Sequence, residues 1–354
     1  MQSENIVADL RSDTITQPDD AMKEAMTRAP LGDDVFGDDP TVRKLEAKAA
    51  ELTGKEAALF VPSGTMGNTI AVAVNTRPGD EIILDGTGHT FSFECGGPAR
   101  LWGVQSRTLQ GERGRIALEA IEAAIRADDD IHLPRTSLVI LEQTCGAAGG
   151  SVLPLDYVQS VGSFCRERGL RLHIDGARVF NASVASGVPV KDIAAPADTL
   201  MFCVSKGLGA PVGSLLAGSG ERIASARRVR KLLGGGMRQA GVLAACGLYA
   251  LESNVERLAD DHLRARQLAR SLEDLKPLGL EVDPPETNMV FLRWPGTGWE
   301  RYRTFAARLE TEGVLGAALF ELGVRLVFHK DVGDRELEHA EKTLKRLLPK
   351  TLGG

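Results

Sequence analysis

The sequence is poor in aromatic residues and in cysteines, and it contains no CxxC pair. Aromatic side chains make up only 5% of the 354 residues, so the core has to be built mainly from alanine, leucine and valine. The five cysteines are widely spaced, which is typical of reduced thiols rather than of a disulfide framework or a zinc site. We therefore expect neither disulfides nor a bound metal.

Long apolar runs and blocks of one charge are also missing. The net charge is -6, charged residues account for 25% of the chain, and the two signs are mixed along it. No basic block indicates a nucleic-acid partner, and no apolar run is long enough for a signal peptide or a membrane span. The absence of GxGxxG disfavours a nicotinamide-dependent dehydrogenase. These absences predict a cytoplasmic protein that acts on small molecules.

The length and the pattern of apolar runs predict an α/β fold in two domains. A chain of 354 residues is too long for one compact core. From about residue 40 to 250, short apolar runs alternate with helical patterns, which is typical of a mostly parallel sheet with helices on both faces. From Val255 onward the pattern changes to a small α+β arrangement. We therefore expect a large domain over 1–254 and a small one over 255–354.

Short apolar runs supply the expected strands. In the large domain they are 56–61, 80–84, 137–141, 170–175, 199–204 and 212–218. In the small domain they are 288–293 and 324–329, beside helices over about 255–275, over 299–312 and from 333 onward. Two helices of the large domain, from Thr41 to Gly54 and over 155–169, follow from apolar residues at helical spacing and a closing glycine.

Asp175 and Lys206 each end an apolar strand, and the two strands are consecutive. The carboxyl ends of parallel strands are where such sheets bind ligands, and a lysine at an apolar strand end is costly to bury unless it has a use. Pyridoxal phosphate needs a lysine that forms an imine and a carboxylate that keeps its ring nitrogen protonated. The alternative is a structural salt bridge between the same two side chains.

The segment PSGTMGN at 62–68 joins an expected strand to a helix. The backbone N–H groups of Gly64 and Thr65, with the hydroxyls of Ser63 and Thr65, would converge at a helix N-terminus and bind an anion. The segment is neither a P-loop nor a GxGxxG turn, and a glycine-rich turn that binds nothing is the alternative. Beside the lysine and the aspartate, it supplies the phosphate cup that the cofactor requires.

Two histidines and three cationic residues are further candidates. His89 follows the turn DGTGH and could stack on a cofactor ring and move a proton, or it could be a solvent-facing loop residue. His132 in DDIHLPRT is equally open. Lys231 and Arg238 flank three glycines and could reach a phosphate, or they could belong to a solvated helix end. Arg325 lies in an apolar strand, which predicts a carboxylate partner.

Several long segments together resemble the threonine aldolase (beta-eliminating lyase) family, in the fold type I group of pyridoxal-phosphate enzymes. They are DLRSDTITQP (9–18), LGDDVFGDDPT, AALFVPSGTMGN, LHIDGARVFNASVASGVP, MFCVSKGLGAPVGS, KLLGGGMRQAGVLAA and VRLVFHKDV. The resemblance covers nearly the whole chain. It implies the fold type I architecture, pyridoxal 5'-phosphate as cofactor, and retro-aldol cleavage of L-threonine and L-allo-threonine to glycine and an aldehyde.

The resemblance also implies a role for each candidate residue. Lys206 matches the lysine that forms the imine, Asp175 the partner of the pyridinium, and His89 the histidine over the ring. His132 matches a second histidine near the substrate hydroxyl. The other matches are the phosphate-cup residues Ser63, Gly64 and Thr65, the cations Lys231 and Arg238, and the substrate-carboxylate ligands Ser12, Arg178 (also near the cofactor) and Arg325.

An assembly follows from the same resemblance. We expect a homodimer or a homotetramer built as a dimer of dimers, with active sites at subunit interfaces and residues 1–20 contributing to them. Lys231 and Arg238 would then reach the cofactor region of a neighbouring subunit.

One stretch departs from the family pattern. Where the family usually carries E-N-T-H-N, this chain has EQTCG over 142–146. The change leaves the lysine, the aspartate and the phosphate cup in place, but it affects a stretch that could tune the cofactor and the substrate range. β-Elimination, transamination and a non-catalytic cofactor-binding protein therefore stay open as alternatives. Cys145 is either a reactive thiol or a small packed residue.

Overall fold

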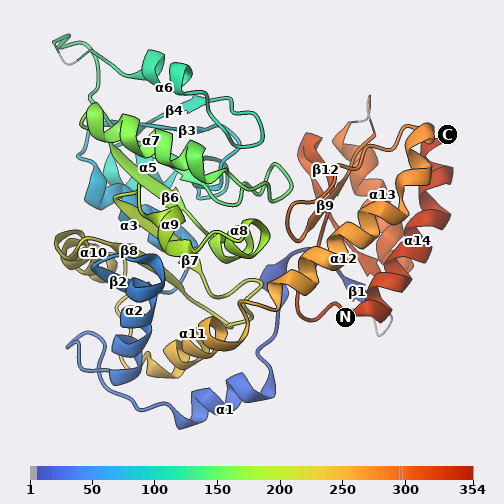
Figure 1. The fold of residues 1–354 in the computed structure, drawn as a ribbon, viewed down its shortest axis with the longest axis horizontal. Helices are drawn as coiled ribbons and strands as arrows, with labels where there is room; N and C mark the ends of the chain where they lie inside the picture. Colours follow the sequence, from blue (N-terminus) through green and yellow to red (C-terminus); the bar gives the residue numbers. More distant parts are fainter. Residues whose placement is uncertain (1–5, 128, 295, 297, 354) are drawn as a thin grey trace.

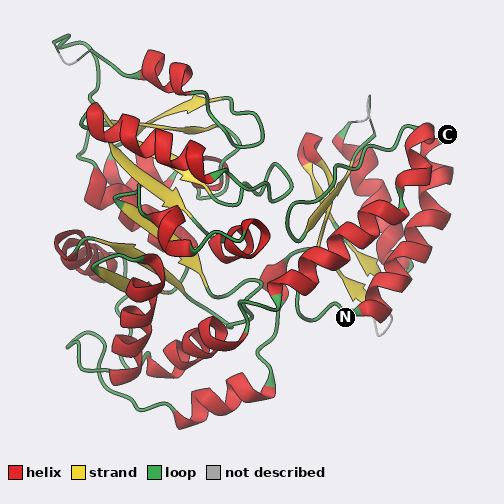
Figure 2. Cartoon of the chain, in the orientation of Figure 1, coloured by secondary structure: helices red, strands yellow, loops and turns green. Residues whose placement is uncertain are grey.

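The structure, a computed structural model, describes residues 6–353 except for positions 128, 295 and 297. Figure 1 shows a larger part built around a seven-stranded sheet and a smaller part that carries a three-stranded sheet. In both parts helices pack around the strands (Figure 2). This arrangement confirms the predicted α/β fold, while the division of the chain at residue 254 stays a prediction.

The large sheet is mostly parallel, as predicted. Its strand order is β2-β8-β7-β6-β5-β3-β4, and β8 runs antiparallel to both of its neighbours. The strands are β2 (Ala57–Val61), β3 (Glu81–Asp85), β4 (Gln105–Leu109), β5 (Thr136–Glu142), β6 (Arg171–Asp175), β7 (Thr199–Cys203) and β8 (Ser214–Gly218). All except β4 coincide with the expected apolar runs. β4 differs because its sequence QSRTL is polar and partly exposed at the sheet edge.

Strand side chains alternate between two cores, one on each face of this sheet. On β3, Ile83 faces one core, whereas its neighbours Ile82 and Leu84 face the other. The first core includes α2 (Pro40–Thr53), α7 (Leu155–Glu167), α8 (Val179–Ser186), α9 (Val190–Ala194) and α11 (Gly241–Ser253), and the second face carries α3 (Gly64–Asn75) and α10 (Gly220–Leu232). The sheet is therefore covered by helices on both faces.

The ends of α2 show how local sequence sets helix boundaries. The carboxylate of Asp39 accepts the N–H groups of Thr41 and Val42, and Pro40 occupies the first helical position. Gly54 ends the helix in the left-handed region, with φ of 63°. The helix thus begins one residue before the predicted start, because the aspartate cap rather than the apolar spacing defines it.

The smaller part combines an antiparallel sheet with three long helices. Its sheet has the order β11-β12-β9, formed by Ala317–Leu319, Gly323–Val327 and Met289–Leu292. Its helices are α12 (Leu258–Ser271), α13 (Trp299–Thr311) and α14 (Asp334–Leu352). The expected helix over 255–275 is shorter, because a 3-10 turn over Glu273–Leu278 follows α12.

The N-terminal segment belongs to the smaller part. β1 (Ala8–Asp9) pairs in parallel with β10 (Val314–Leu315), and Leu10 is buried in the core of the small sheet. Figure 1 shows this blue strand beside the red C-terminal segment. Because Thr16 then donates its hydroxyl to the backbone oxygen of Lys206 at 2.8 Å, the same segment reaches the larger part.

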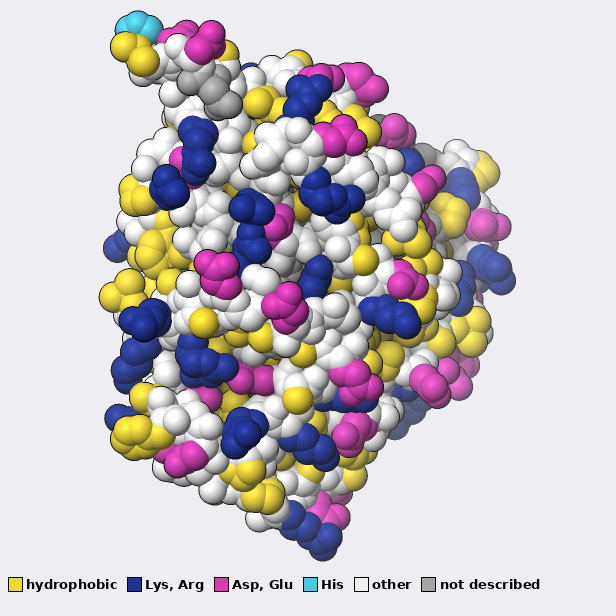
Figure 3. Space-filling model, turned by 60° about the vertical axis from the view of Figure 1, so that its left-hand side comes forward, with side chains coloured by type: hydrophobic (Ala, Val, Ile, Leu, Met, Phe, Trp, Pro, Cys, Tyr) yellow, Lys and Arg dark blue, Asp and Glu magenta, His cyan; other side chains and the backbone are white. Residues whose placement is uncertain are grey.

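The surface shows no separation of charge on the face in view. Figure 3 shows lysine and arginine side chains interspersed with acidic and apolar ones. Among the described residues, no helix is both long and apolar enough to cross a bilayer.

The remaining helices of the larger part are short. They are α1 (Asp20–Arg28), α4 (His89–Ser92), α5 (Gly97–Trp102) and α6 (Leu118–Ala124).

Candidate active site

A cavity of about 340 Å³ opens at the carboxyl ends of β6 and β7, where parallel sheets usually bind ligands. Its walls come from the β2–α3 turn, α4, the ends of β6 and β7, and the N-terminal segment. They are Thr14, Pro62, Ser63, Gly64, Thr65, Asn68, His89, Glu94, Asp175, Ala177, Met201, Cys203, Ser205, Lys206, Pro211 and Val212. Six sequence candidates, Ser63, Gly64, Thr65, His89, Asp175 and Lys206, therefore meet in one cavity.

Asp175 and Lys206 line this cavity without forming an ion pair in the described part of the chain. Asp175 ends β6 and is only 2% exposed. Its Oδ2 accepts Asn68 Nδ2 at 2.7 Å and its Oδ1 accepts the N–H of Ala177 at 3.2 Å. Lys206 Nζ instead lies 3.4 Å from Cys203 Sγ. The geometry therefore favours a shared ligand over the structural salt bridge that the sequence left open.

The turn between β2 and α3 places an anion site at one end of the cavity. Ser63 caps α3, and its Oγ accepts the N–H of Met66 at 3.2 Å. The first N–H groups of a helix, here those of Gly64 and Thr65, have no partner within the helix and are free for an anion. A Cβ atom on Gly64 would lie 2.9 Å from Cys203 Sγ, so the close packing at this position requires glycine.

His89 is held by a glutamate that the sequence did not single out. His89 begins α4, and its Nδ1 lies 2.9 Å from Oε1 of Glu94, which is 4% exposed. The hydrogen bond to Glu94 raises the pKa of His89, and burial raises the pKa of Glu94. Asn68 Nδ2 also donates to Glu94 Oε1, at 2.8 Å. The second oxygen of Glu94 is buried without a hydrogen-bond partner, which suits a cavity that takes a polar ligand.

The ligand atoms of His89, Glu94 and Asp175 all lie within 4.8 Å of one another, close enough to share a metal ion. Asn68, however, directs N–H groups at both carboxylates, and donors pointed at these oxygens oppose a cation. The arrangement therefore fits a carboxylate anchor for a protonated pyridine nitrogen better than it fits a metal.

Glu142 connects the stretch EQTCG (142–146), which differs from the family pattern, to His89 in the cavity wall. Its two oxygens accept the backbone N–H groups of His89 at 2.7 Å and of Gly146 at 2.8 Å. Burial, with the nearby charge of Asp175, raises the pKa of Glu142 to about 7. Cys145 is 1% exposed, and burial raises the pKa of its thiol to about 12. Cys145 is thus a packed, protonated residue rather than a reactive thiolate.

A buried ion pair lies beside Lys206. Arg178 donates through Nε and Nη2 to the two carboxylate oxygens of Asp13, at 2.7 and 2.6 Å. Burial opposes ionisation of Asp13, yet the charge and hydrogen bonds of Arg178 outweigh it and lower the pKa of Asp13 to about 2. The sequence did not identify Asp13 as a site residue, although it lies in the segment DLRSDTITQP that resembles the family.

Arg325 and Ser12 each form a hydrogen bond with the N-terminal segment. One terminal nitrogen of Arg325 donates to the backbone oxygen of Arg11 at 3.2 Å, while its Nε is buried without a partner. Burial and the neighbouring Arg178 lower the pKa of Arg325 to about 10. Ser12 Oγ accepts the N–H of Thr14. A buried guanidinium with an unused donor needs an anion, and among the described residues no carboxylate forms an ion pair with it.

Replacing Asp13 with asparagine should destabilise the protein by about 3–5 kcal/mol, because the guanidinium of Arg178 would stay buried without its counter-charge. The midpoint of thermal unfolding should fall accordingly. Since the pKa of Asp13 is depressed in the folded state, its contribution exists above the unfolded value and is lost as the pH falls from about 4 toward 2. The unfolding midpoints of the variant and the wild type should therefore become equal at acid pH.

The exposed pair of Asp20 and Lys23 on α1 provides the control. Asp20→Asn should change the unfolding midpoint very little, because exposed pairs contribute roughly 0–1 kcal/mol. Equal losses in the two variants would mean that the buried pair has no special role.

Three further candidates, like Ser12, Arg178 and Arg325, are absent from the cavity wall that Lys206 and Asp175 line. His132 is exposed in the loop between α6 and β5, which Figure 1 shows projecting from the body. Lys231 is exposed at the end of α10. Arg238 is also exposed, and it pairs with Asp33 at 3.0 Å.

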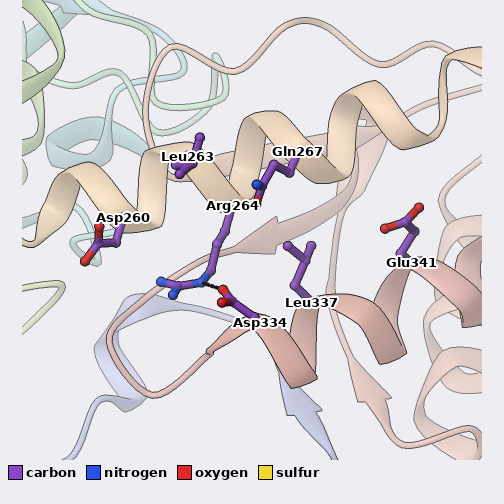
Figure 4. A pocket seen from close by; sticks show the side chains of 7 residues that line it. All are labelled: Asp260, Leu263, Arg264, Gln267, Asp334, Leu337 and Glu341. Atoms are coloured by element: carbon purple, nitrogen blue, oxygen red, sulfur yellow. Dashed lines mark hydrogen bonds and ion pairs between the residues drawn. The ribbon is translucent and has the colours of Figure 1, made fainter.

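A second hollow, of about 470 Å³, lies in the smaller part between α12 and α14 (Figure 4). Arg264 spans it to pair with Asp334 at 2.9 Å, while Leu263, Leu337 and Glu341 complete its walls. It contains none of the predicted site residues, so the chemistry is concentrated in the first cavity.

The chain is similar to known proteins in sequence and in fold. A family model described as beta-eliminating lyase matches residues 9–295. The low specificity L-threonine aldolase of Escherichia coli (strain K12) is 46% identical over 330 residues, covering 93% of this chain and 96% of that enzyme. The low-specificity L-threonine aldolase 1 of Arabidopsis thaliana is 45% identical over 334 residues, covering 94% and 93%. A solved threonine aldolase from Leishmania major superposes with a TM-score of 0.81 at 21% identity, covering 97% and 100%.

Proposed function

Because the chain belongs to the beta-eliminating lyase family, with threonine aldolases among its relatives, we propose that it cleaves L-threonine and L-allo-threonine to glycine and acetaldehyde with pyridoxal 5'-phosphate. The family membership expected from the sequence is confirmed. One observation carries the proposal for the site, namely that Lys206, Asp175, His89 and the anion-binding turn line a single cavity.

The residues of the cavity fit the cofactor. Lys206 offers an amine for the cofactor's aldehyde carbon, Asp175 a buried carboxylate for its ring nitrogen, and the turn over 63–65 free N–H groups for its phosphate. When bound, the cofactor supplies an electron sink that accepts the electron pair of the bond broken at Cα.

Arg325 and Ser12 are the proposed ligands of the substrate carboxylate. The unused Nε of Arg325 is a buried donor without a partner, and a carboxylate would satisfy it. Arg178 already donates two hydrogen bonds to Asp13. We propose that it helps Arg325 and Ser12 to orient the substrate carboxylate. A fixed carboxylate determines which bond at Cα stands perpendicular to the ring and hence which bond breaks.

His89 is placed to move the proton of the substrate's β-hydroxyl. Glu94 holds Nδ1 and raises the pKa of the imidazole, so Nε2 is the nitrogen available to the cavity. Replacement of His89 by asparagine should lower kcat about 100- to 10,000-fold if it, or a water that it orients, is the base. We expect a loss of the same order for His132→Asn. A loss below tenfold at either position would remove that residue from the base's role.

His132, Lys231 and Arg238 are proposed to complete the site of a neighbouring subunit. Each is exposed and accompanied by a large exposed apolar side chain, namely Ile131, Leu232 and, in the loop that Arg238 contacts, Phe36, at 95%, 74% and 80% exposure. We propose that these three apolar side chains become buried at the subunit contact. The proposed assembly is a homotetramer, a dimer of dimers.

Subunit mixing tests this assembly. His132→Asn and Lys206→Ala enzymes should each be inactive, yet mixed and reassembled subunits should regain activity, because some sites then combine intact residues from two chains. If the mixture stays inactive while wild-type subunits reassemble, each chain builds its site alone.

The activity itself is tested by product analysis. Purified enzyme loaded with cofactor should convert L-threonine and L-allo-threonine to equal amounts of glycine and acetaldehyde. A 2-oxo acid with ammonia would indicate β-elimination, and an amino group passed to a 2-oxo acid would indicate transamination. Bound cofactor without any of these products would indicate a non-catalytic binding protein.

A further inference from the structure

His173 lies inside β6, two residues before Asp175, and has no exposed surface. Residues two apart on a strand share a face, so this imidazole lies behind the carboxylate of the cavity. Its Nε2 is 3.1 Å from Asn68 Oδ1, and its Nδ1 is 2.9 Å from Thr199 Oγ1. Burial lowers the pKa of His173 to about 4, so at neutral pH the ring is uncharged and carries one N–H.

The contacts on the cavity side determine which nitrogen carries that hydrogen. Asn68 Nδ2 lies 2.7 Å from an Asp175 oxygen and 2.8 Å from a Glu94 oxygen. Ionised carboxylates only accept hydrogen bonds, so the amide nitrogen must face them and donate both of its hydrogens. The oxygen of Asn68 then faces His173 and needs a donor, which has to be the Nε2–H group.

The contacts on the opposite side of the ring are compatible with a hydrogen on Nε2. Arg222 Nε donates to Asn75 Oδ1 at 3.1 Å, and a guanidinium can only donate. Asn75 Nδ2 therefore donates to the backbone oxygen of Ala71 at 2.8 Å and to Thr199 Oγ1 at 3.0 Å. The Thr199 hydroxyl accepts from Asn75 and keeps its own hydrogen, which it can donate to Nδ1 of the imidazole when Nε2 carries the ring hydrogen.

We infer that His173 is a positioning residue, which keeps the Asn68 amide turned with its two N–H bonds on Asp175 and Glu94. The Asn68 side chain thereby holds both Asp175, the proposed partner of the cofactor's ring nitrogen, and Glu94, the partner of His89. The inference rests on the proposed function for its significance, but the contacts that carry it lie within the protein.

The Asn68 amide needs a fixed orientation because it lies between the carboxylates of Asp175 and Glu94. Oxygens of Asp175 and Glu94 lie within 4.8 Å of each other, and like charges at this distance repel. An inverted amide would present its oxygen to both carboxylates and remove the N–H that each of them now accepts from Asn68. An uncharged histidine that donates from Nε2 makes the inverted orientation unfavourable.

Thr199 allows a test that leaves the cavity untouched. Thr199→Val keeps the shape but removes the hydroxyl, while Thr199→Ser keeps the hydroxyl and serves as the matched control. Without the hydroxyl, Nδ1 of His173 faces only the backbone oxygen of residue 199, at 3.2 Å, and that oxygen favours the Nδ1–H tautomer. ¹⁵N NMR of histidine-labelled enzyme, with the His173 signal assigned from His173→Phe, should show Nε2 protonated in the wild type and in T199S but not in T199V.

The cofactor gives the second readout. The dissociation constant for pyridoxal phosphate, measured on apoenzyme, should rise about three- to tenfold in T199V and less than twofold in T199S, as expected for one hydrogen bond. If the two variants bind the cofactor equally and His173 keeps its hydrogen on Nε2 in both, the inference is wrong. Failure of the wild type to bind the cofactor at all would instead contradict the proposed function.

Discussion

An enzyme with alanine in place of Lys206 should lose at least about 10⁴-fold in kcat, the largest effect that we expect from a single substitution. Lys206 is the lysine in the cavity wall, and its side chain is the proposed covalent anchor of the cofactor. The variant would lose that bond and an amine positioned to carry a proton. Rates of acetaldehyde release and absorbance spectra of the purified enzyme measure the two losses separately.

The controls separate the amine from its charge. Lys206→Arg keeps the positive charge but offers no amine for imine formation, so we expect it to resemble the alanine variant. Lys330→Ala, outside the cavity wall, should behave like the wild type. Added methylamine should restore part of the activity of Lys206→Ala. After borohydride reduction, peptide mapping should place the cofactor on Lys206, and a label on another lysine would overturn the assignment.

Asp175→Asn should have the second largest effect, a loss of about 100- to 1,000-fold in kcat together with weaker cofactor binding. A carboxylate beside the ring nitrogen raises the nitrogen's pKa by about 1–3 units, and the amide would remove this effect. The amide would also direct its NH₂ group at one of the two donors that Asp175 now accepts, Asn68 or the backbone of Ala177. The pH titration of the cofactor's visible absorbance should report the shift directly.

A cofactor analogue with carbon in place of the ring nitrogen provides the control for this prediction. With the analogue bound, wild type and Asp175→Asn should be almost equally slow, because the carboxylate then has no nitrogen to protonate. A persistent difference of 100-fold would show that Asp175 acts by another route.

Most of the fold could be predicted because its signals are local. The strands β3, β5 and β7 contain runs of consecutive buried apolar residues, as expected for strands covered on both faces, and β6 contributes Leu172 and Ile174. β4 could not be recognised in this way, because an edge strand with polar side chains resembles a loop. Helix starts were displaced where a cap outside the apolar pattern, such as Asp39, defines the first turn.

The cavity was predictable in part for the same reason. Lys206 and Asp175 are identified by their position at strand ends, whereas Asn68, Glu94 and Asp13 gain their roles only from partners brought close by folding. Asn68 is 107 residues from Asp175, and Asp13 is 165 from Arg178. Asn68 did leave a signal, because it is a polar residue one helical turn after Gly64, on the side of α3 that is buried.

The parallel pairing of β1 with β10 has a consequence for biosynthesis. Val314, the partner of Ala8, is added to the chain about 300 residues after it. At roughly 5–20 residues per second, this segment waits on the order of 15–60 s before it can dock. The nascent chain therefore carries β1 unpaired while the roughly 300 residues between the two strands are translated.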